Sequence, residues 1–228
     1  MVDFVFVPGA GGMAWYWHRV IPIIRAAGHE AVAVDLPADD PKAGLTAYAD
    51  IVVRAMAQPG DVILVAQSLA GFTAPLVCAR VPIRMLVLVN AMIPKPGETA
   101  GGWWEATGAI QARERAAKHG GYPAEFDIGT YFLHDLSEAV LRDSPQRPRE
   151  EAEIVFGEAC QFERWPQIPI KVLAGIEDRF FPIEFQRRVA RERLEKEVDE
   201  ISGGHLVALS NAGGLAARLL AFEKGLIH

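Results

Sequence analysis

The chain has 228 residues, half of them hydrophobic, and a formal net charge of −6 from 23 Lys and Arg against 29 Asp and Glu. This length suits one domain, 1–228, with enough apolar side chains for a core. The negative balance argues against a nucleic-acid partner, which favours clustered basic residues, and no apolar run is long enough to span a membrane. The first residues lack the basic start of a signal peptide. We therefore expect a cytoplasmic protein that binds neither membrane nor nucleic acid.

Strand-like apolar runs alternate with helical patterns along the chain. In chain order we expect a strand at Asp3–Val7, a helix at Trp15–Ala27, a strand at Glu30–Val34, a helix at Leu45–Gln58, a strand at Val62–Ala66, a helix at Leu69–Arg80, a strand at Met85–Val89, a strand at Lys171–Ala174, a helix at Ile183–Leu194, a strand at Glu197–Ile201 and a helix at Leu206–Lys224. This rhythm predicts an α/β fold with a mostly parallel sheet and helices on both faces.

The segment of about residues 94–169 interrupts this rhythm, because it lacks a good strand pattern. It is too long for a structureless loop, so we expect a small helical cap over the carboxyl ends of the strands. Trp103 and Trp104 are candidates for an apolar wall of a substrate pocket, with packing inside the cap as the alternative. His134 and Asp135 could line the same pocket, or could form a solvated helix end.

Ser68 directly follows a strand that is apolar at every position, Val62–Ala66, and a helical pattern comes next. Ala66 and Ala70 lie two residues to either side of it, and Gly71 follows. A sharp strand-to-helix turn requires small residues there, as in the G-x-S-x-G nucleophile elbow, with alanine here in place of both glycines. The pattern indicates a serine nucleophile only if partner residues are present.

Two such partners follow later strands. Asp178 comes after Lys171–Ala174, and His205 comes after Glu197–Ile201. Ligands bind beyond the carboxyl ends of the strands in such sheets, and the chain order Ser, Asp, His is that of α/β-hydrolases. A serine hydroxyl needs an imidazole to take its proton, and the imidazole needs a carboxylate to orient it. Glu177 is the rival acid, and we expect it to point to solvent.

The oxyanion hole of such a site uses the backbone N–H after the nucleophile and one from the loop after the first strand. These are the N–H groups of Leu69 and Ala10. Gly11 is the adjacent alternative if the loop is shifted by one residue. The glycine-rich loop lets the backbone approach a substrate closely, so Gly9 and Gly11 are also candidates for the pocket wall.

The segment from Pro8 to Arg19, Pro-Gly-Ala-Gly-Gly-Met-Ala-Trp-Tyr-Trp-His-Arg, resembles the His-Gly-x-x-x-Gly-x-Trp-x-Trp segment of plant methylesterases and hydroxynitrile lyases, a branch of the α/β-hydrolase superfamily. The acid segment from Glu177 to Arg187 and the histidine segment from Gly204 to Leu206 are similar to the same branch. The resemblance covers the core from Phe4 to about Leu220. It implies an α/β-hydrolase fold, a Ser-His-Asp triad, and neither a metal nor an organic cofactor.

Three positions depart from the pattern of that branch. Pro8 replaces the usual histidine, and Gly9 stands where the lyases carry threonine. Leu206 replaces a lysine that positions the cyanide group in the lyases, so its absence argues against lyase activity. The sequence also begins at what would be the superfamily's third strand, so we expect a trimmed sheet of about six strands.

A dinucleotide site is one alternative interpretation. Gly9–Ala14 fits G-x-G-x-x-G/A after a strand, and Asp35 ends the next strand, as in an NAD(P)-binding Rossmann fold. Pro8 stiffens that loop, however, and Trp15 and Trp17 crowd the place of a pyrophosphate. A receptor that keeps the triad without turnover is a second alternative.

Cys78 and Cys160 stand apart, without the spacing of metal ligands, so we expect no metal site. Taken together, the residues predict a serine hydrolase of the carboxylesterase type that acts through an acyl-enzyme. The expected partner is a small to medium apolar carboxylic ester, with thioesters and lactones open to the same residues. The oligomeric state stays open, with a homodimer as one alternative.

Overall fold

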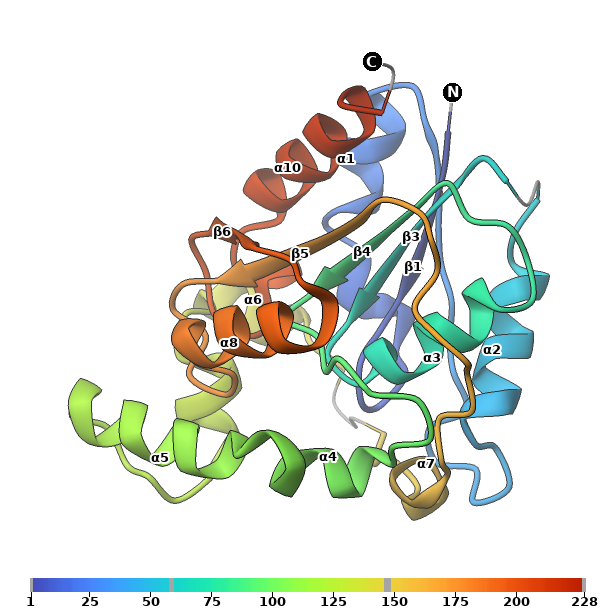
Figure 1. Ribbon diagram of the computed structural model, residues 1–228. Coiled ribbons are helices and arrows are strands. Elements are labelled where there is room, and N and C mark those ends of the chain that lie inside the picture. Colours follow the sequence, from blue (N-terminus) through green and yellow to red (C-terminus); the bar gives the residue numbers. More distant parts are fainter. Residues whose placement is uncertain (1, 58–59, 146–148, 227–228) are drawn as a thin grey trace.

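The computed structural model describes residues 2–57, 60–145 and 149–226. Its centre is a six-stranded sheet in the order β2-β1-β3-β4-β5-β6, in which every neighbouring pair is parallel (Figure 1). The strands are β1 (Asp3–Val7), β2 (Glu30–Ala33), β3 (Val62–Gln67), β4 (Met85–Val89), β5 (Ile170–Gly175) and β6 (Val198–Ile201). Each of them lies within one residue of its predicted bounds, so the predicted parallel sheet is confirmed.

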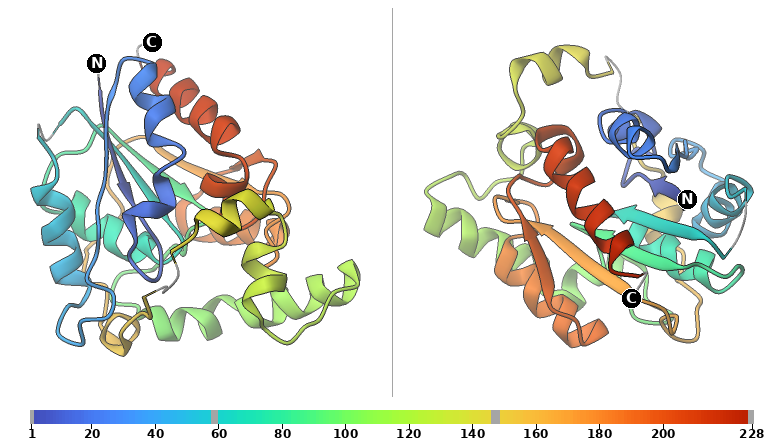
Figure 2. Two further views of the ribbon diagram at one scale, coloured as in Figure 1. Left: turned by 180° about the vertical axis from the view of Figure 1, so that it is seen from behind. Right: turned by 90° about the horizontal axis from the view of Figure 1, so that it is seen from above.

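The two faces of the sheet are buried by different sets of helices. Successive side chains of a strand point to opposite faces: Val5 and Val7 join one apolar cluster, and Phe4 and Phe6 join the other. The first cluster lies under α2 (Leu45–Arg54), α3 (Ala70–Cys78) and α8 (Ile183–Leu194). The second lies under α1 (Ile21–Ala26), α9 (Val207–Ser210) and α10 (Ala212–Lys224). Figure 2 shows α1 and α10 side by side on this face of the sheet.

The segment between β4 and β5 holds further helices beyond the carboxyl ends of the strands (Figure 1). They are α4 (Ala100–Thr107), α5 (Ala109–Gly120), the π-helical turn η2 (Gly129–Leu133), α6 (Glu138–Asp143) and α7 (Glu153–Gly157). The Thr99 hydroxyl caps α4 by accepting the Gly102 N–H at 3.0 Å. Gly108, with φ 64°, then turns the chain from α4 into α5.

The predicted first helix, Trp15–Ala27, is wrong as one continuous helix. The structure has a 3-10 turn, η1 (Ala14–Trp17), followed by the separate helix α1. Pro22 explains the break, because proline has no N–H to donate to the carbonyl four residues earlier and is tolerated only in the first turn of a helix. Pro22 accordingly lies in the first turn of α1.

Two other predicted helices differ in extent. The predicted C-terminal helix, Leu206–Lys224, is divided into α9 and α10 at Asn211, whose side chain accepts the Gly214 N–H at 3.1 Å and starts a new helix. Helix α2 ends at Arg54, and its predicted end at Gln58 lies outside the described residues.

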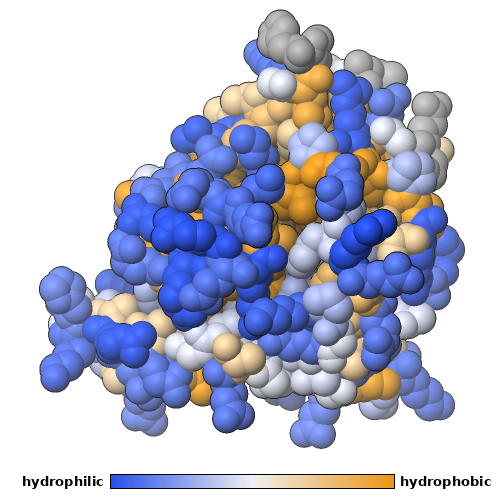
Figure 3. All heavy atoms as spheres, in the orientation of Figure 1, coloured by the Kyte–Doolittle hydropathy of each residue, from blue (hydrophilic) through white to orange (hydrophobic). Residues whose placement is uncertain are grey.

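Charged side chains cover much of the molecular surface. In Figure 3 the Arg and Glu side chains of α8 form a hydrophilic area on the left, where several of them are ion-paired. None of the helices in the described part of the chain is long and apolar enough to cross a membrane.

Candidate active site

Ser68 lies in the turn between β3 and α3, at the carboxyl end of the sheet. Its φ of 52° is in the left-handed region, which few residues other than glycine adopt. The Ser68 N–H donates to the Val89 carbonyl at 3.2 Å, and the Ser68 carbonyl accepts the N–H of Met92 at 3.0 Å. A Cβ on Gly71 would lie 1.7 Å from the Met92 carbonyl oxygen, so only glycine fits there. These contacts hold the serine in a strained turn with its side chain beyond the sheet.

The structure brings Ser68, His205 and Asp178 into one hydrogen-bonded row. His205 Nε2 lies 3.0 Å from Ser68 Oγ, and His205 Nδ1 lies 2.8 Å from Asp178 Oδ2. All three residues are buried, with relative exposures of 8%, 2% and 4% for serine, histidine and aspartate. The other carboxylate oxygen of Asp178 accepts the N–H groups of Phe180 at 2.8 Å and Phe181 at 2.9 Å. The row therefore ends on a carboxylate that the backbone holds in place.

The loop Gly9–Gly12 after β1 faces the serine turn. Gly9, Gly11 and Gly12 each donate their N–H to another group of the protein, at 3.0, 2.8 and 3.0 Å. Among the described residues, the N–H of Ala10 has no such partner, and neither has the N–H of Leu69 beside the serine. Gly11 and Gly12 have φ values of 84° and 61°, which favour glycine. The loop thus leaves the Ala10 N–H, and not that of Gly11, available to a ligand.

A cavity of about 520 Å³ opens above Ser68 and His205. Its volume is within the range of small-molecule sites. Its walls include the loop residues Gly9, Ala10 and Gly11 and a set of apolar side chains, among them Met13, Trp15, Ile128, Phe132, Leu141 and Leu206. Arg149 and Glu151 supply a polar end. The cavity can therefore bind a mostly apolar molecule with one group held over the serine.

The comparisons with known proteins are consistent with this arrangement. A sequence profile described as the alpha/beta hydrolase family matches residues 4–218. The chain belongs to the alpha/beta hydrolase family. It is 36% identical over 110 residues to "Probable esterase PIR7A" of Oryza sativa subsp. indica, which covers 43% of this chain and 42% of that protein. The match thus spans well under half of that relative's length.

A further relative and a solved structure match this alpha/beta hydrolase over almost its whole length. "Methylesterase 3" of Arabidopsis thaliana is 26% identical over 249 residues, covering 95% of this chain and 94% of that protein. The crystal structure of polyneuridine aldehyde esterase superposes with a TM-score of 0.77 at 20% identity, covering 98% of this chain and 99% of that chain. The predicted fold and the predicted resemblance to the methylesterase branch are confirmed.

Asn90 is a buried polar residue that the sequence reasoning missed. It follows β4 directly, has a φ of 45° and is fully buried. Its side-chain NH₂ donates to the carbonyls of Gly204 and His205 at 3.1 and 3.0 Å, and its oxygen accepts the Gly175 N–H at 2.8 Å. It therefore ties the end of β5 to the histidine loop. In the sequence, this role is indicated only by the position of Asn90, a single amide residue that directly follows an entirely apolar strand.

Two glutamines complete this buried polar support. The Gln67 oxygen accepts the Gly9 N–H at 3.0 Å, and its NH₂ lies 3.4 Å from the His205 carbonyl. Gln67 thus connects the glycine loop to the histidine loop beneath the serine. The NH₂ of Gln186 on α8 reaches Asp178 Oδ2 at 3.3 Å. Both side chains are almost fully buried, so their amides have only protein partners to satisfy them.

Trp103 and Trp104 are not among the residues that line the cavity above Ser68. Trp103 is fully buried and donates its Nε1–H to the Ile93 carbonyl at 3.1 Å. Trp104 packs edge-on against Phe180, whose ring in turn lies against His205, with 5.0 Å between ring centroids. The tryptophans therefore form a second layer behind the phenylalanines that contact the histidine, which is the packing that the sequence analysis gave as the alternative to a pocket wall.

Glu177, the rival acid, is exposed to solvent as expected, but its carboxylate is also held by hydrogen bonds. Its carboxylate accepts the Gly203 N–H and the Ser202 hydroxyl, the latter at 3.2 Å. Asp135 behaves similarly from the cap segment, because its carboxylate accepts the Gly204 N–H at 2.5 Å. Both carboxylates hold the loop before His205 and neither contacts the imidazole.

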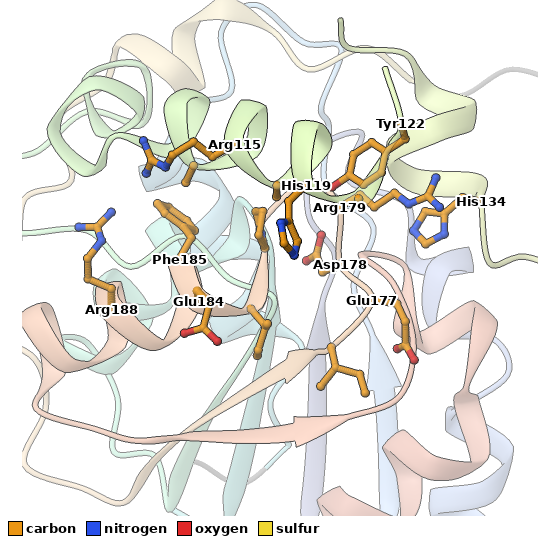
Figure 4. A pocket seen from close by; sticks show the side chains of 16 residues that line it. Arg115, His119, Tyr122, His134, Glu177, Asp178, Arg179, Glu184, Phe185 and Arg188 are labelled. Carbon is orange, nitrogen blue, oxygen red and sulfur yellow. The ribbon is translucent and has the colours of Figure 1, made fainter. Parts of the chain in front are cut away.

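A larger cavity of about 800 Å³ lies between α5 and α8, on the far side of the Asp178 loop (Figure 4). Arg115, His119 and Arg188 line it, but Ser68 and His205 do not. Arg188 is paired with Glu192 at 2.9 Å. The smaller cavity is therefore the one that Ser68 and His205 face, while Asp178 lines the larger one.

His134 also lines this larger cavity, so it is not part of the wall above the serine. Burial lowers the pKa of His134 below its ordinary value, and the neighbouring Arg179 lowers it further. Asp35, the acid of the alternative dinucleotide reading, accepts the Ala14 N–H at 3.1 Å and forms an ion pair with Arg149 at 2.5 Å. Within the part of the chain that the structure describes, no group of three or more His, Cys, Asp or Glu side chains could hold a metal ion.

Proposed function

We propose that this chain is a carboxylic ester hydrolase that uses Ser68 as nucleophile, His205 as general base and acid, and Asp178 as the group that orients His205. The observation that carries the proposal is the row of hydrogen bonds from Ser68 Oγ through both nitrogens of His205 to Asp178, on the floor of an apolar cavity. The esterases among its relatives support the same reaction class.

Acylation begins when the Ser68 oxygen attacks the ester carbonyl and its proton passes to His205 Nε2. Asp178 accepts the Nδ1–H, which keeps the imidazole in the tautomer with a lone pair at Nε2 and stabilises its charged form. His205 then returns the proton to the departing alkoxide, which leaves as the alcohol. The acyl group stays bonded to Ser68.

Deacylation repeats these steps with water as the nucleophile. His205 removes a proton from the water, the resulting hydroxide attacks the acyl carbonyl, and the proton returns to the Ser68 oxygen as the acid leaves. In both halves the carbonyl oxygen becomes an oxyanion. The free N–H groups of Ala10 and Leu69 flank the serine and would stabilise that charge.

The walls of the cavity support a small or medium-sized apolar substrate. Its volume of about 520 Å³ and its many apolar side chains suit an acyl or alcohol group without charge. Leu206 follows the histidine and lines this cavity, where the lyases of the related branch carry lysine. We assign the shaping of this cavity to a cap of about residues 94–169 within a single domain, 1–228.

A panel of p-nitrophenyl esters of graded chain length tests the proposal. We expect turnover by the wild type and a loss of several powers of ten in Ser68→Ala, since removal of one member of such a triad forfeits the concerted step. Ser137→Ala is the matched control, because this serine caps α6 by accepting the Val140 N–H at 3.4 Å and is not among the residues that line the cavity, so turnover should stay unchanged. Equal turnover by Ser68→Ala would refute the assignment, and labelling of Ser68 without turnover would favour a receptor.

A further inference from the structure

The segment Arg149–Ala152 packs against the glycine loop from the outside. The Arg149 guanidinium donates to the Gly12 carbonyl at 3.3 Å and to the Leu36 carbonyl at 2.9 Å. The Ala152 N–H donates to the Ala38 carbonyl at 2.7 Å. A Cβ on Gly11 would lie 3.0 Å from the Arg149 carbonyl oxygen, so the two backbones are almost in contact.

Glu151 makes the central contact of this segment. One carboxylate oxygen accepts the Gly11 N–H at 2.8 Å, and the other accepts the Tyr48 hydroxyl at 2.5 Å. Tyr48 lies on α2 and is only 2% exposed, so it is anchored in the core. Glu151 therefore links the glycine loop to a fixed helix across 140 residues of sequence.

Ala10 lies between two peptide groups that are held from opposite sides. Gln67 holds the Gly9 N–H from beneath the loop, and Glu151 holds the Gly11 N–H from the cap segment. Glycines have little preference for one backbone conformation, so the direction of the Ala10 N–H depends on these two contacts and on the turn closed by the Gly12 N–H, which donates to the Gly9 carbonyl at 3.0 Å. A donor must point at the developing oxyanion to stabilise it, and a small misorientation costs rate.

We propose that Glu151 is a positioning residue that orients the Ala10 N–H toward the oxyanion by holding Gly11 against the core. The proposal rests on the proposed esterase function of Ser68. The contact needs an acceptor and not a charge, because the Gly11 N–H can donate to a carboxylate oxygen or to an amide oxygen. A glutamine at this position keeps that acceptor, and its NH₂ can donate to the Tyr48 oxygen.

The groups around Glu151 set its charge. Burial raises the pKa of Glu151 above the ordinary value, while its hydrogen bonds from Tyr48 and Gly11 and the charge of Arg149 lower it. Arg149 is itself paired with Asp35 on the loop after β2. An ionised carboxylate near the oxyanion opposes the charge that develops there, so an uncharged acceptor should serve at least as well.

The test compares Glu151→Ala, Glu151→Gln and the control Glu150→Ala. Glu150 is exposed, belongs to the same segment and loses the same charge. With p-nitrophenyl butyrate we expect Glu151→Ala to lower kcat about tenfold with KM within about twofold, a part of the loss caused by removing an oxyanion donor outright. Glu151→Gln should stay within about threefold of the wild type, and Glu150→Ala should match it.

A trifluoromethyl ketone that adds to serine supplies an independent measurement. Its affinity should fall in Glu151→Ala in parallel with kcat, and should recover in Glu151→Gln, because the adduct places an oxyanion in the same hole. An unchanged kcat in Glu151→Ala would overturn the proposal. A Glu151→Gln variant as impaired as Glu151→Ala would also overturn it, since the acceptor is retained.

Hydrogen exchange of the peptide containing Gly11 tests the role of Glu151 independently of the proposed esterase function. If the wild type has no esterase activity, the esterase assignment fails, and exchange alone decides the role of Glu151. Faster exchange in folded Glu151→Ala, but not in Glu150→Ala, supports the proposal. Equal exchange in both variants would contradict it.

Discussion

Replacement of Asn90 by alanine tests whether its buried amide stabilises the loops that carry Asp178 and His205. Asn90 is fully buried, and its side chain hydrogen-bonds Gly175, Gly204 and His205. In Asn90→Ala the Gly175 N–H and the Gly204 carbonyl lose the partner that the side chain supplied. The His205 carbonyl keeps a second donor in Gln67, at 3.4 Å.

The magnitude follows from the groups left without a partner. An unsatisfied buried donor or acceptor costs about 1–3 kcal/mol, and the left-handed backbone at φ 45° costs alanine roughly 1 kcal/mol more than asparagine. We therefore expect Asn90→Ala to lower the free energy of unfolding by about 3–7 kcal/mol. For a domain of this size, Tm then falls by roughly 6–28 °C.

Urea unfolding followed by circular dichroism measures this change, with Asn211→Ala as the control. Asn211 is the matched asparagine at the start of α10, where its half-buried side chain caps the helix and donates to the Ser202 carbonyl at 2.8 Å. Its removal should cost only about 1–2 kcal/mol. A loss below about 1 kcal/mol in Asn90→Ala, or a loss equal to that of Asn211→Ala, would refute the reasoning.

Three other predictions concern the acid, the turn and the cap segment. Asp178→Asn should lower kcat by about 10⁴-fold, because the imidazole loses its orienting acceptor, whereas Glu177→Gln should stay within a few-fold; equal losses would contradict the assignment. Gly71→Ala should abolish folding or lower Tm strongly in thermal unfolding, since its Cβ would overlap the Met92 carbonyl, whereas Gly157→Ala, with open space around its Cβ, should be tolerated. Burial raises the pKa of Glu151 in the folded state, so its ionisation destabilises the fold as pH rises through that pKa. The Tm advantage of Glu151→Gln over the wild type should therefore grow from pH 4 to pH 8, and a constant difference would refute this.

The sheet could be predicted because local pattern and tertiary environment agree there. The run Val62–Ala66 is apolar at every position, and the corresponding strand β3 is buried on both faces. The prediction of one helix over Trp15–Ala27 was wrong because the apolar periodicity continues through Pro22. Proline lacks the N–H that a helix interior needs, so a new helix starts there. Single backbone groups of this kind set where one helix ends and the next begins. The spacing of apolar residues along the sequence carries no information about them.

The candidate site was partly accessible from sequence for a related reason. Ser68, Asp178 and His205 each follow a strand, and the ends of parallel strands meet at one edge of the sheet. Asn90 follows a strand too, but its role depends on which backbone groups lie opposite its side chain, and those of Gly175 and Gly204 are 85 and 114 residues away in the sequence. Glu151 carries no motif at all. Its contact with Gly11 comes from the path of the chain between α6 and α7, which no local pattern sets.

Labelling with a fluorophosphonate, read by peptide mass spectrometry together with ester turnover, tests the central claim most directly. We predict that the wild type carries one label on the peptide containing Ser68 and loses its turnover as the label accumulates. Ser68→Ala should show neither labelling of that peptide nor turnover above the rate in buffer. Turnover by Ser68→Ala at the rate of the wild type, or a label on a different residue that abolishes activity, would contradict the account.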